Sequence, residues 1–208
     1  MTTNLSRRTV IQAFTASVVT GALAGRALAQ SLLHANDALS LLRSGALNIY
    51  MRHGITDRSQ SDTGRRGDRM GQRNLSAEGE RQVTALGHAL RKLGVPVAVV
   101  LTSEVFRAQD TARLAFGEVS IHPALIADDY TAGDPRDDAA QVSSLLAKPT
   151  TGGNRILVGH IAPLGIIMGR SFSQAEFPEG SLALFRPEGS SWRFLGVVSA
   201  ETVIGAAS

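Results

Sequence analysis

Arginine and histidine side chains follow three apolar segments of the chain. Arg52 and His53 come directly after the apolar run IYM, Arg107 lies in TSEVFRAQDTA shortly after a second run, and His160 ends a third, ILVGH. If these runs are neighbouring strands of a parallel sheet, their carboxyl ends share one edge and the four side chains converge there. Guanidinium groups bind phosphate-like anions in a bidentate manner, and an imidazole can act as a nucleophile. These residue types therefore predict a compact anion site at one edge of a sheet.

The periodicity of the chain predicts the strands and helices that such a site needs. Apolar or alternating runs indicate strands near residues 47–52, 95–103, 119–123 and 154–160, with a hairpin formed by 181–187 and 192–199. Helical spacing and capping residues indicate helices over 32–45, 76–94 and 105–116, and one that ends near 148 after a polar loop through 138. The run at 95–103 is expected to be buried on both faces, and 161–165 is expected to be a turn. This alternation predicts a single α/β domain with a mostly parallel central sheet and helices on both faces.

Residues 1–29 carry the pattern of a twin-arginine export signal. Arg7 and Arg8 precede an apolar run, and the small-residue pattern ALA places the expected cleavage after Ala29. The apolar run is shorter than the roughly 20 residues that a membrane-spanning helix needs, so a membrane anchor is the weaker alternative. We therefore expect a periplasmic or otherwise exported domain over 30–208, without a stable membrane span in its mature form. The twin-arginine export machinery is the expected partner of the precursor.

The charge balance changes when this signal is set aside. The chain of 208 residues has a formal net charge of +3, and Arg7, Arg8 and Arg26 account for that excess, so the remaining domain is neutral. A neutral domain lacks the basic balance that is typical of a nucleic-acid-binding protein. The chain also has no cysteine, which excludes a thiolate nucleophile and a cysteine zinc site.

Four motifs follow one another along the chain: RHG at 52–54, LSAEGERQ at 75–82, TSEVFRAQDTA at 102–112 and VGH at 158–160. Together they resemble the histidine phosphatase superfamily, whose fold is shared with cofactor-dependent phosphoglycerate mutases. The resemblance implies that His53 is a nucleophile that forms a phosphohistidine. It also implies that Arg52, Arg107 and His160 hold the phosphate, and that the enzyme is a metal-independent, histidine acid phosphatase-type phosphomonoesterase without a cofactor.

The resemblance leaves the proton donor for the leaving alcohol open. In the superfamily a carboxylic acid often comes from the loop after the arginine motif, which here contains PALIADDYTAGD. Asp128 and Asp129 are therefore the candidates, in preference to Glu104 within the arginine motif. The LxE pattern that is common at this place is missing from the chain.

A polar loop rich in glycine and arginine follows the first strand. Gly54, Arg58, Arg65 and Arg66 are candidates for substrate binding, because Gly54 allows a sharp exit from the strand and the arginines could engage a second anionic group. Aspartates are interleaved with these arginines, so a solvated, mobile loop is the alternative.

The short chain looks more similar to exported branch-1 phosphatases of the lipopolysaccharide-core type than to phytases, since Ile161 follows His160 where phytases carry an aspartate. The substrate class that this implies is a phosphorylated small molecule or a glycan- or lipid-linked phosphate. Three other functions stay open: a phosphoglycerate mutase-type phosphotransferase, a catalytically silent exported anion-binding or interaction protein, and a metal-dependent hydrolase that uses His53, His160 and an aspartate. Neighbouring arginines disfavour the last, because they oppose binding of a cation.

Overall fold

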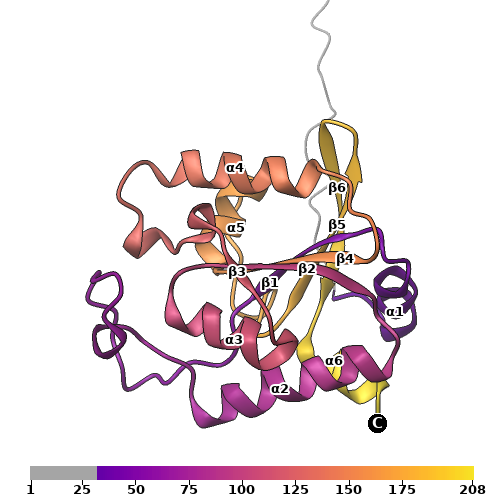
Figure 1. Cartoon of the computed structure of the whole chain (residues 1–208), viewed down its shortest axis with the longest axis horizontal. Coiled ribbons are helices and arrows are strands. Elements are labelled where there is room, and N and C mark those ends of the chain that lie inside the picture. Colours follow the sequence, from indigo (N-terminus) through magenta and orange to yellow (C-terminus); the bar gives the residue numbers. More distant parts are fainter. Residues whose placement is uncertain (1–31) are drawn as a thin grey trace, which may run out of the picture.

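A six-stranded sheet in the order β3-β2-β4-β1-β5-β6 forms the centre of the molecule (Figure 1). The computed structural model describes residues 32–208, so the export signal predicted for 1–29 lies outside the described residues. The first four strands are mutually parallel, whereas β5 is antiparallel to β1 and β6 is antiparallel to β5. The strands are β1 (Asn48–Arg52), β2 (Val97–Thr102), β3 (Ser120–Ile121), β4 (Asn154–Gly159), β5 (Leu182–Glu188) and β6 (Ser191–Val198).

Helices cover both faces of this sheet, as the sequence predicts (Figure 1). One face carries α1 (Ala35–Arg43), α2 (Ala77–Lys92), α3 (Phe106–Phe116) and α6 (Ala200–Ala206). The other carries α4 (Pro135–Ala147) and α5 (Ile161–Met168), which pack against each other. Three short 3-10 helices lie in the connections: η1 (Arg69–Gly71), η2 (Pro123–Leu125) and η3 (Asp128–Tyr130).

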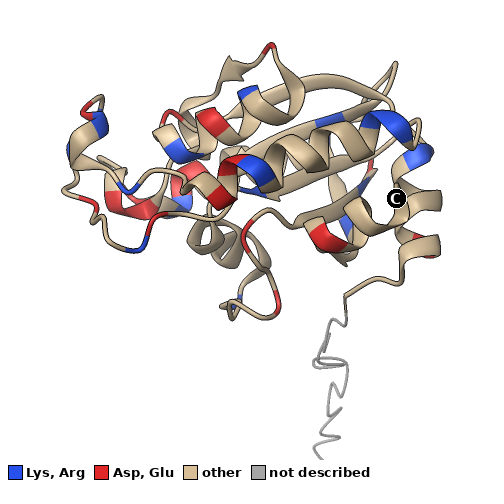
Figure 2. Cartoon of the chain, turned by 90° about the horizontal axis from the view of Figure 1, so that it is seen from below, with Lys and Arg blue, Asp and Glu red and all other residues tan. Residues whose placement is uncertain are grey.

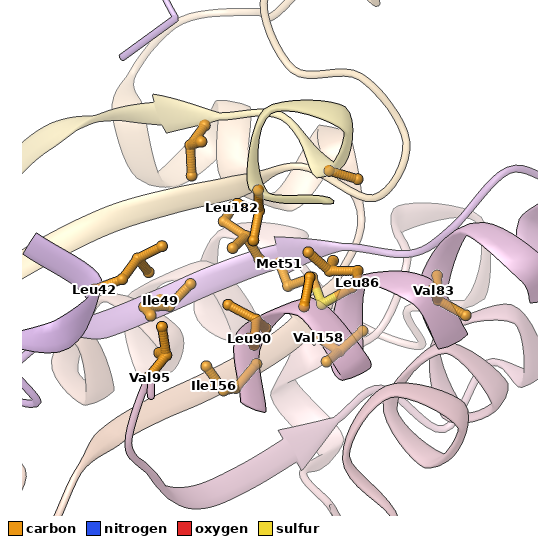
Figure 3. Packing of buried hydrophobic residues seen from close by; sticks show 14 of the residues in the cluster. Leu42, Ile49, Met51, Val83, Leu86, Leu90, Val95, Ile156, Val158 and Leu182 are labelled. Atoms are coloured by element: carbon orange, nitrogen blue, oxygen red, sulfur yellow. The ribbon is translucent and has the colours of Figure 1, made fainter. Parts of the chain in front are cut away.

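β1 lies between β4 and β5, and all of its residues are buried. Successive side chains point to opposite faces of a strand. Ile49 and Met51 therefore pack on the α2 side with Leu86 and Val158, as Figure 3 shows, whereas Tyr50 belongs to the hydrophobic cluster on the α4 side. This two-sided burial fixes the register of β1, because a shift by one residue would exchange the two faces. The residues at the end of β1 are thereby held at a defined place on the sheet edge.

The structure corrects the burial that the sequence predicts for the second strand. Of the residues of β2 only Thr102 is buried, and Val99 is 41% exposed. The outer neighbour of β2 is β3, which is only two residues long, so most of β2 lies at the rim of the sheet. A continuous apolar run therefore does not require here that both faces of the strand be covered.

Three helix boundaries also differ from those that the sequence predicts. The loop expected through 138 ends earlier, because Asp134 caps α4 by accepting a hydrogen bond from Arg136 N at 2.9 Å and Pro135 occupies the first turn. The expected turn at 161–165 is the start of α5, and α6 has no counterpart among the predicted elements. The sequence contains the capping residues Asp134 of α4 and Ser199 of α6, but α5 has no side-chain cap, and α5 and α6 are too short for a clear periodic signal.

The loop between β1 and α2 projects beyond the sheet at the left of Figures 1 and 2, where Figure 2 shows acidic and basic residues side by side. The start of α2 is anchored beneath this loop. Ser76 Oγ accepts a hydrogen bond from Gly79 N at 3.0 Å, and a Cβ atom on Gly79 would lie 1.9 Å from the carbonyl oxygen of Ile55. The absence of a side chain at Gly79 therefore lets α2 pack directly against the chain as it leaves β1.

Replacing Gly79 with alanine should destabilise the domain although alanine favours helices. The added methyl group collides with backbone and not with a flexible side chain, so we expect a loss of about 1–3 kcal/mol in the free energy of unfolding. Gly205→Ala in α6 is the matched control, since a Cβ there meets nothing within 4 Å and helix propensity alone predicts a gain of up to about 1 kcal/mol. Urea unfolding followed by circular dichroism measures both, and equal effects of the two variants would contradict this packing.

Candidate active site

The four side chains singled out by the sequence converge at the carboxyl ends of β1, β2 and β4. Arg52 ends β1 and pairs in register with Gly159, the last residue of β4, so His53 and His160 leave neighbouring strands side by side. Their ring centroids are 5.4 Å apart. Arg107 comes from the first turn of α3, and all four side chains belong to residues that are only 3% exposed. The structure therefore brings the predicted cationic and imidazole groups into one buried cluster.

The backbone around both histidines is held by hydrogen bonds on each side. His53 N donates to Gly159 O at 3.1 Å, and His53 O accepts from Gly180 N at 2.8 Å. The hydroxyl of Tyr50 donates to His160 O at 2.9 Å and accepts from His160 N at 3.0 Å. Because the backbone is fixed at both residues, the two rings keep a defined separation and orientation.

Hydrogen bonds also assign the ring nitrogens of both histidines. His53 Nδ1 lies 2.9 Å from Gly54 O, and a carbonyl oxygen only accepts, so the proton is on Nδ1 and the lone pair is on Nε2. His160 Nε2 lies 3.0 Å from Ser103 Oγ, which already accepts from Val105 N at 3.2 Å. When the Ser103 hydroxyl donates to Nε2, the proton of His160 is on Nδ1, which is buried and has no hydrogen-bond partner within residues 32–208. The site thus presents a free lone pair on His53 Nε2 and, in the His160 tautomer that accepts from Ser103, a free N–H on His160 Nδ1.

The charges of the cluster follow from its burial. Burial, and next the charge of Arg107, lowers the pKa of His53 well below its usual value, and the same two causes act on His160. Burial also lowers the pKa of Arg52 to about 10, although the charge of Glu179 favours the cation. At neutral pH the site therefore combines neutral imidazoles with charged guanidinium groups.

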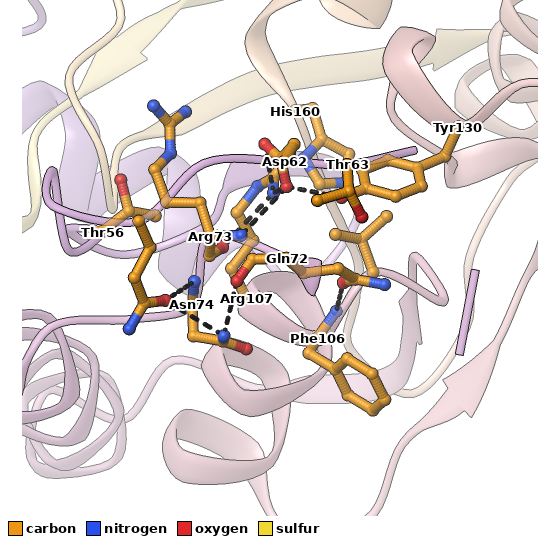
Figure 4. Close-up of polar contacts among 12 residues, drawn as sticks. Thr56, Asp62, Thr63, Gln72, Arg73, Asn74, Phe106, Arg107, Tyr130 and His160 are labelled. Atoms are coloured by element: carbon orange, nitrogen blue, oxygen red, sulfur yellow. Dashed lines mark hydrogen bonds and ion pairs between the residues drawn. The ribbon is translucent and has the colours of Figure 1, made fainter. Parts of the chain in front are cut away.

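Asp62, in the loop between β1 and α2, is the counter-charge of Arg107. Its two carboxylate oxygens lie 2.9 and 3.1 Å from Arg107 Nη1. Oδ1 also accepts from the hydroxyl of Tyr130 at 2.6 Å and from Arg73 N at 3.0 Å, and Figure 4 shows this carboxylate between the arginine and the tyrosine. No local pattern indicates this role, since Asp62 is one of several aspartates in a polar loop.

Glu179, just before β5, is the counter-charge of Arg52. Its Oε1 lies 3.8 Å from Arg52 Nη2 and accepts from Thr56 Oγ1 at 2.9 Å, while Oε2 accepts from Arg58 Nη2 at 2.9 Å. Arg52 Nη1 donates to Phe177 O at 2.6 Å. Glu179 was missed by sequence reasoning because it lies far along the chain in an irregular segment. The one signal that points to such a residue is general: a buried arginine needs an acidic partner.

The loop residues predicted to bind substrate have different surroundings. Gly54 is packed tightly, because a Cβ atom there would lie 2.5 Å from Val83 Cγ1. Arg66 donates through Nε and Nη2 to Tyr130 O at 2.8 and 2.6 Å and lies 3.3 Å from a carboxylate oxygen of Glu104, so it ties the loop to η3. Arg58 is engaged with Glu179, as described above, and Arg65 is exposed.

The candidate acids lie on η3, and both are exposed. Asp128 lines a cavity of about 610 Å³ whose wall includes Ile161, the residue after His160, and Phe172. Asp129 is not among the residues that line this cavity. Within the described residues, no group of three or more histidine, aspartate and glutamate side chains is arranged to hold a metal ion.

The doubly covered sheet with basic residues at its carboxyl edge defines a phosphatase-like class of α/β protein. The model of the histidine phosphatase superfamily (branch 1) matches residues 49–130, which include β1, Arg52, His53 and Arg107. This match agrees with the resemblance to the histidine phosphatase superfamily that the motifs predict. It supports a phosphatase as the class of protein.

Solved structures share this fold at low sequence identity. The protein histidine phosphatase SixA, complexed with tungstate, is 17% identical over 74% of this chain and 97% of its own, with a TM-score of 0.54. A phosphoserine phosphatase from Entamoeba histolytica, in complex with phosphoserine, is 14% identical over 75% of this chain and 98% of its own, with a TM-score of 0.55. YhfR from Bacillus stearothermophilus is 17% identical over 76% of this chain and 98% of its own, with a TM-score of 0.54. No curated protein matches the sequence.

The lowered pKa values of the two histidines predict that the domain loses stability in acid. An unfolded histidine has a pKa of about 6.5 and the folded values lie below it, so between them the unfolded state binds more protons. The free energy of unfolding should therefore fall as the pH drops below about 6.5, by up to about 1.4 kcal/mol per pH unit for each histidine.

Urea unfolding at several pH values between about 7.5 and 5.5 measures this slope. His160→Gln should make it shallower, because a titrating group that is buried in the folded state is removed. His88→Gln, which replaces an exposed histidine of α2, is the matched control and should keep the slope. A slope that is the same in His160→Gln as in the unaltered protein would contradict the assignment.

Proposed function

We propose that the protein is a phosphomonoesterase that works through a phosphohistidine intermediate on His53. The observation that carries this proposal is the free Nε2 lone pair of a neutral His53 among two buried arginines and a second histidine. A phosphomonoester carries two negative charges, and guanidinium groups can bind its oxygens while the phosphorus faces the attacking nitrogen. The match to the superfamily model and the neutral nucleophile support the proposal independently of each other.

The proposed reaction has two steps. In the first, His53 Nε2 forms a bond to phosphorus while the bond to the alcohol oxygen breaks, and the alcohol leaves with a proton from a carboxylic acid. Arg52 and Arg107 stabilise the charge on the transferred group, and the Nδ1–H of His160 donates to an equatorial oxygen. In the second step, the carboxylate takes a proton from water, the water oxygen forms a bond to phosphorus while the bond between phosphorus and His53 Nε2 breaks, and inorganic phosphate leaves with His53 regenerated. These steps use side chains of the chain alone and require no metal ion or cofactor.

For the proton donor we favour Asp128 over Asp129. Asp128 and Ile161, the residue directly after His160, line the same cavity, which supports a place for the alcohol beside both the carboxyl group and the phosphate site. The wall of this cavity combines the apolar Ile161 and Phe172 with the cationic Arg136 and Arg170. Such a wall suits an alcohol that carries an apolar part or a further anionic group.

The cellular place and the natural substrate belong to the same proposal. The twin-arginine pattern at 1–29 supports export, and exported phosphatases meet phosphorylated small molecules and glycan- or lipid-linked phosphates. Among the described residues, no helix is both long and apolar enough to cross a membrane. A catalytically silent anion-binding protein is the second candidate, because Arg52 and Arg107 are already paired with internal carboxylates.

Hydrolysis of an aryl phosphate by the purified domain tests the main proposal. We expect turnover that persists with chelator and is lost in His53→Ala, because the nucleophile is then missing, whereas His88→Ala should leave turnover intact. Release of inorganic phosphate is the measurement, and samples quenched with denaturant at alkaline pH, where a phosphohistidine is stable, should contain phosphorylated protein only when His53 is present. No turnover in the intact protein would support the silent binding protein, and loss of turnover with chelator would favour a metal-dependent hydrolase.

The leaving group distinguishes the candidate acids. Asp128→Asn should lower kcat for an alkyl phosphate about 10²-fold or more while it spares an activated aryl phosphate, whose phenolate leaves without a proton. Asp129→Asn is the matched comparison on the same 3-10 helix. The selective loss in Asp129→Asn instead would move the role to that residue, and equal losses on both substrates would remove the role from either.

A further inference from the structure

The contacts of the Asp62 carboxylate describe a binding position for an oxyanion. We propose that Asp62 takes the place of the substrate phosphoryl group, and that the hydroxyl of Tyr130 and the N–H of Arg73 become phosphate ligands when substrate displaces this carboxylate. The inference rests on the proposed function for the nature of the substrate, and it adds phosphate ligands that the four motifs do not contain. It also makes the loop between β1 and α2 a competitor of the substrate.

The geometry of the donors supports this position. Three donors from different segments point to one carboxylate: Arg107 Nη1 at 2.9 Å, the hydroxyl of Tyr130 at 2.6 Å and Arg73 N at 3.0 Å. A guanidinium, a hydroxyl and a backbone N–H are the kinds of donor that bind phosphate oxygens in proteins. Figure 4 shows that they surround the carboxylate from η3, from α3 and from the loop itself. Arg107 also keeps a buried Nε without a partner inside the described part of the chain, so it can bind a further oxygen.

The state of the Asp62 carboxyl argues against a role as proton donor. Burial acts to raise its pKa, but the hydrogen bonds from Tyr130 and Arg73 N and the charge of Arg107 outweigh burial and hold the pKa below its usual value. Every contact named here donates to the carboxylate, which therefore lacks the proton that a general acid must supply. An ionised carboxylate that accepts several hydrogen bonds resembles a bound anion more closely than it resembles a general acid.

Displacement exchanges one anion for another at the same donors. When a phosphoryl dianion replaces the carboxylate, Arg107 keeps a counter-charge, so no buried cation is left unpaired. The hydroxyl of Tyr130 donates to Asp62 in the free protein and to phosphate in the complex. Its hydrogen bond to Asp62 is lost as the hydrogen bond to phosphate forms. This exchange gives the inference a quantitative signature, because the contribution of Tyr130 to phosphate affinity should depend on whether Asp62 is present.

Calorimetric titration with inorganic phosphate measures this coupling without need of turnover. Asp62→Asn keeps the shape of the side chain and removes its charge, so it should bind phosphate about tenfold more tightly. Tyr130→Phe alone should change the affinity by less than about twofold, because the bonds lost in the two states offset each other. In the Asp62→Ala background, where residue 62 has no oxygen that accepts from the hydroxyl, the same Tyr130→Phe change should weaken binding about tenfold. Asp57→Asn is the control, since Asp57 is on the same loop but its carboxylate, among the described residues, accepts only from Ser59 and Gln60, and the change should leave the affinity unchanged.

Two results would overturn the inference. Asp62→Asn that binds phosphate no more tightly would show that the carboxylate does not compete, and equal effects of Tyr130→Phe in both backgrounds would show that the hydroxyl is not shared. Tyr130→Phe by itself can still overturn the inference if Asp62→Asn fails to fold, because a weakening beyond about twofold in the otherwise unaltered protein contradicts a shared position. If the coupling holds in a protein without turnover, the inference stands and the proposed function fails. If turnover is found without the coupling, the proposed function stands and the inference fails.

Discussion

The burial of two guanidinium groups beside two imidazoles is the constraint on which the rest of the structure depends. A buried cation without a partner costs roughly several kcal/mol, and here Arg52 and Arg107 are each only 3% exposed. The chain meets this cost with Glu179, from the segment before β5, and Asp62, from the loop after β1. Two segments far apart in the sequence thus fold over the same sheet edge to balance its charge. The same burial keeps His53 neutral, which is the form that a nucleophile requires.

The structure divides the site into a rigid part and an adaptable part. His53 and His160 continue directly from neighbouring parallel strands, and backbone hydrogen bonds fix them on both sides. Asp62 and Glu179 lie on irregular segments, where a change of conformation does not disrupt the sheet. The core therefore holds the two histidines, on whose geometry the proposed phosphoryl transfer depends. The carboxylates of Asp62 and Glu179 are held by irregular segments, from which the proposed displacement by a ligand does not disturb the sheet.

Most of the fold could be read from the sequence because apolar periodicity reports burial. The strands β1 and β4 are continuous apolar runs at the centre of the sheet, and α2 carries both a serine cap and an amphipathic pattern. The predictions of secondary structure and burial fail where the apolar periodicity is weak, or where the position of a strand in the sheet decides its burial. α5 and α6 are short helices, and β2 is apolar yet partly exposed, since it lies at the rim beside a strand of two residues.

The sequence by itself determined the chemical groups of the site and the family that they resemble. RHG, the arginine motif and VGH each lie at the end of a strand, and parallel strands bring their carboxyl ends to one edge, so the convergence of Arg52, His53, Arg107 and His160 was predictable. Only the tertiary structure decided which carboxylates neutralise them. Asp62 and Glu179 have no local pattern, because a counter-charge is selected by its distance in space from a buried cation and not by its spacing along the chain.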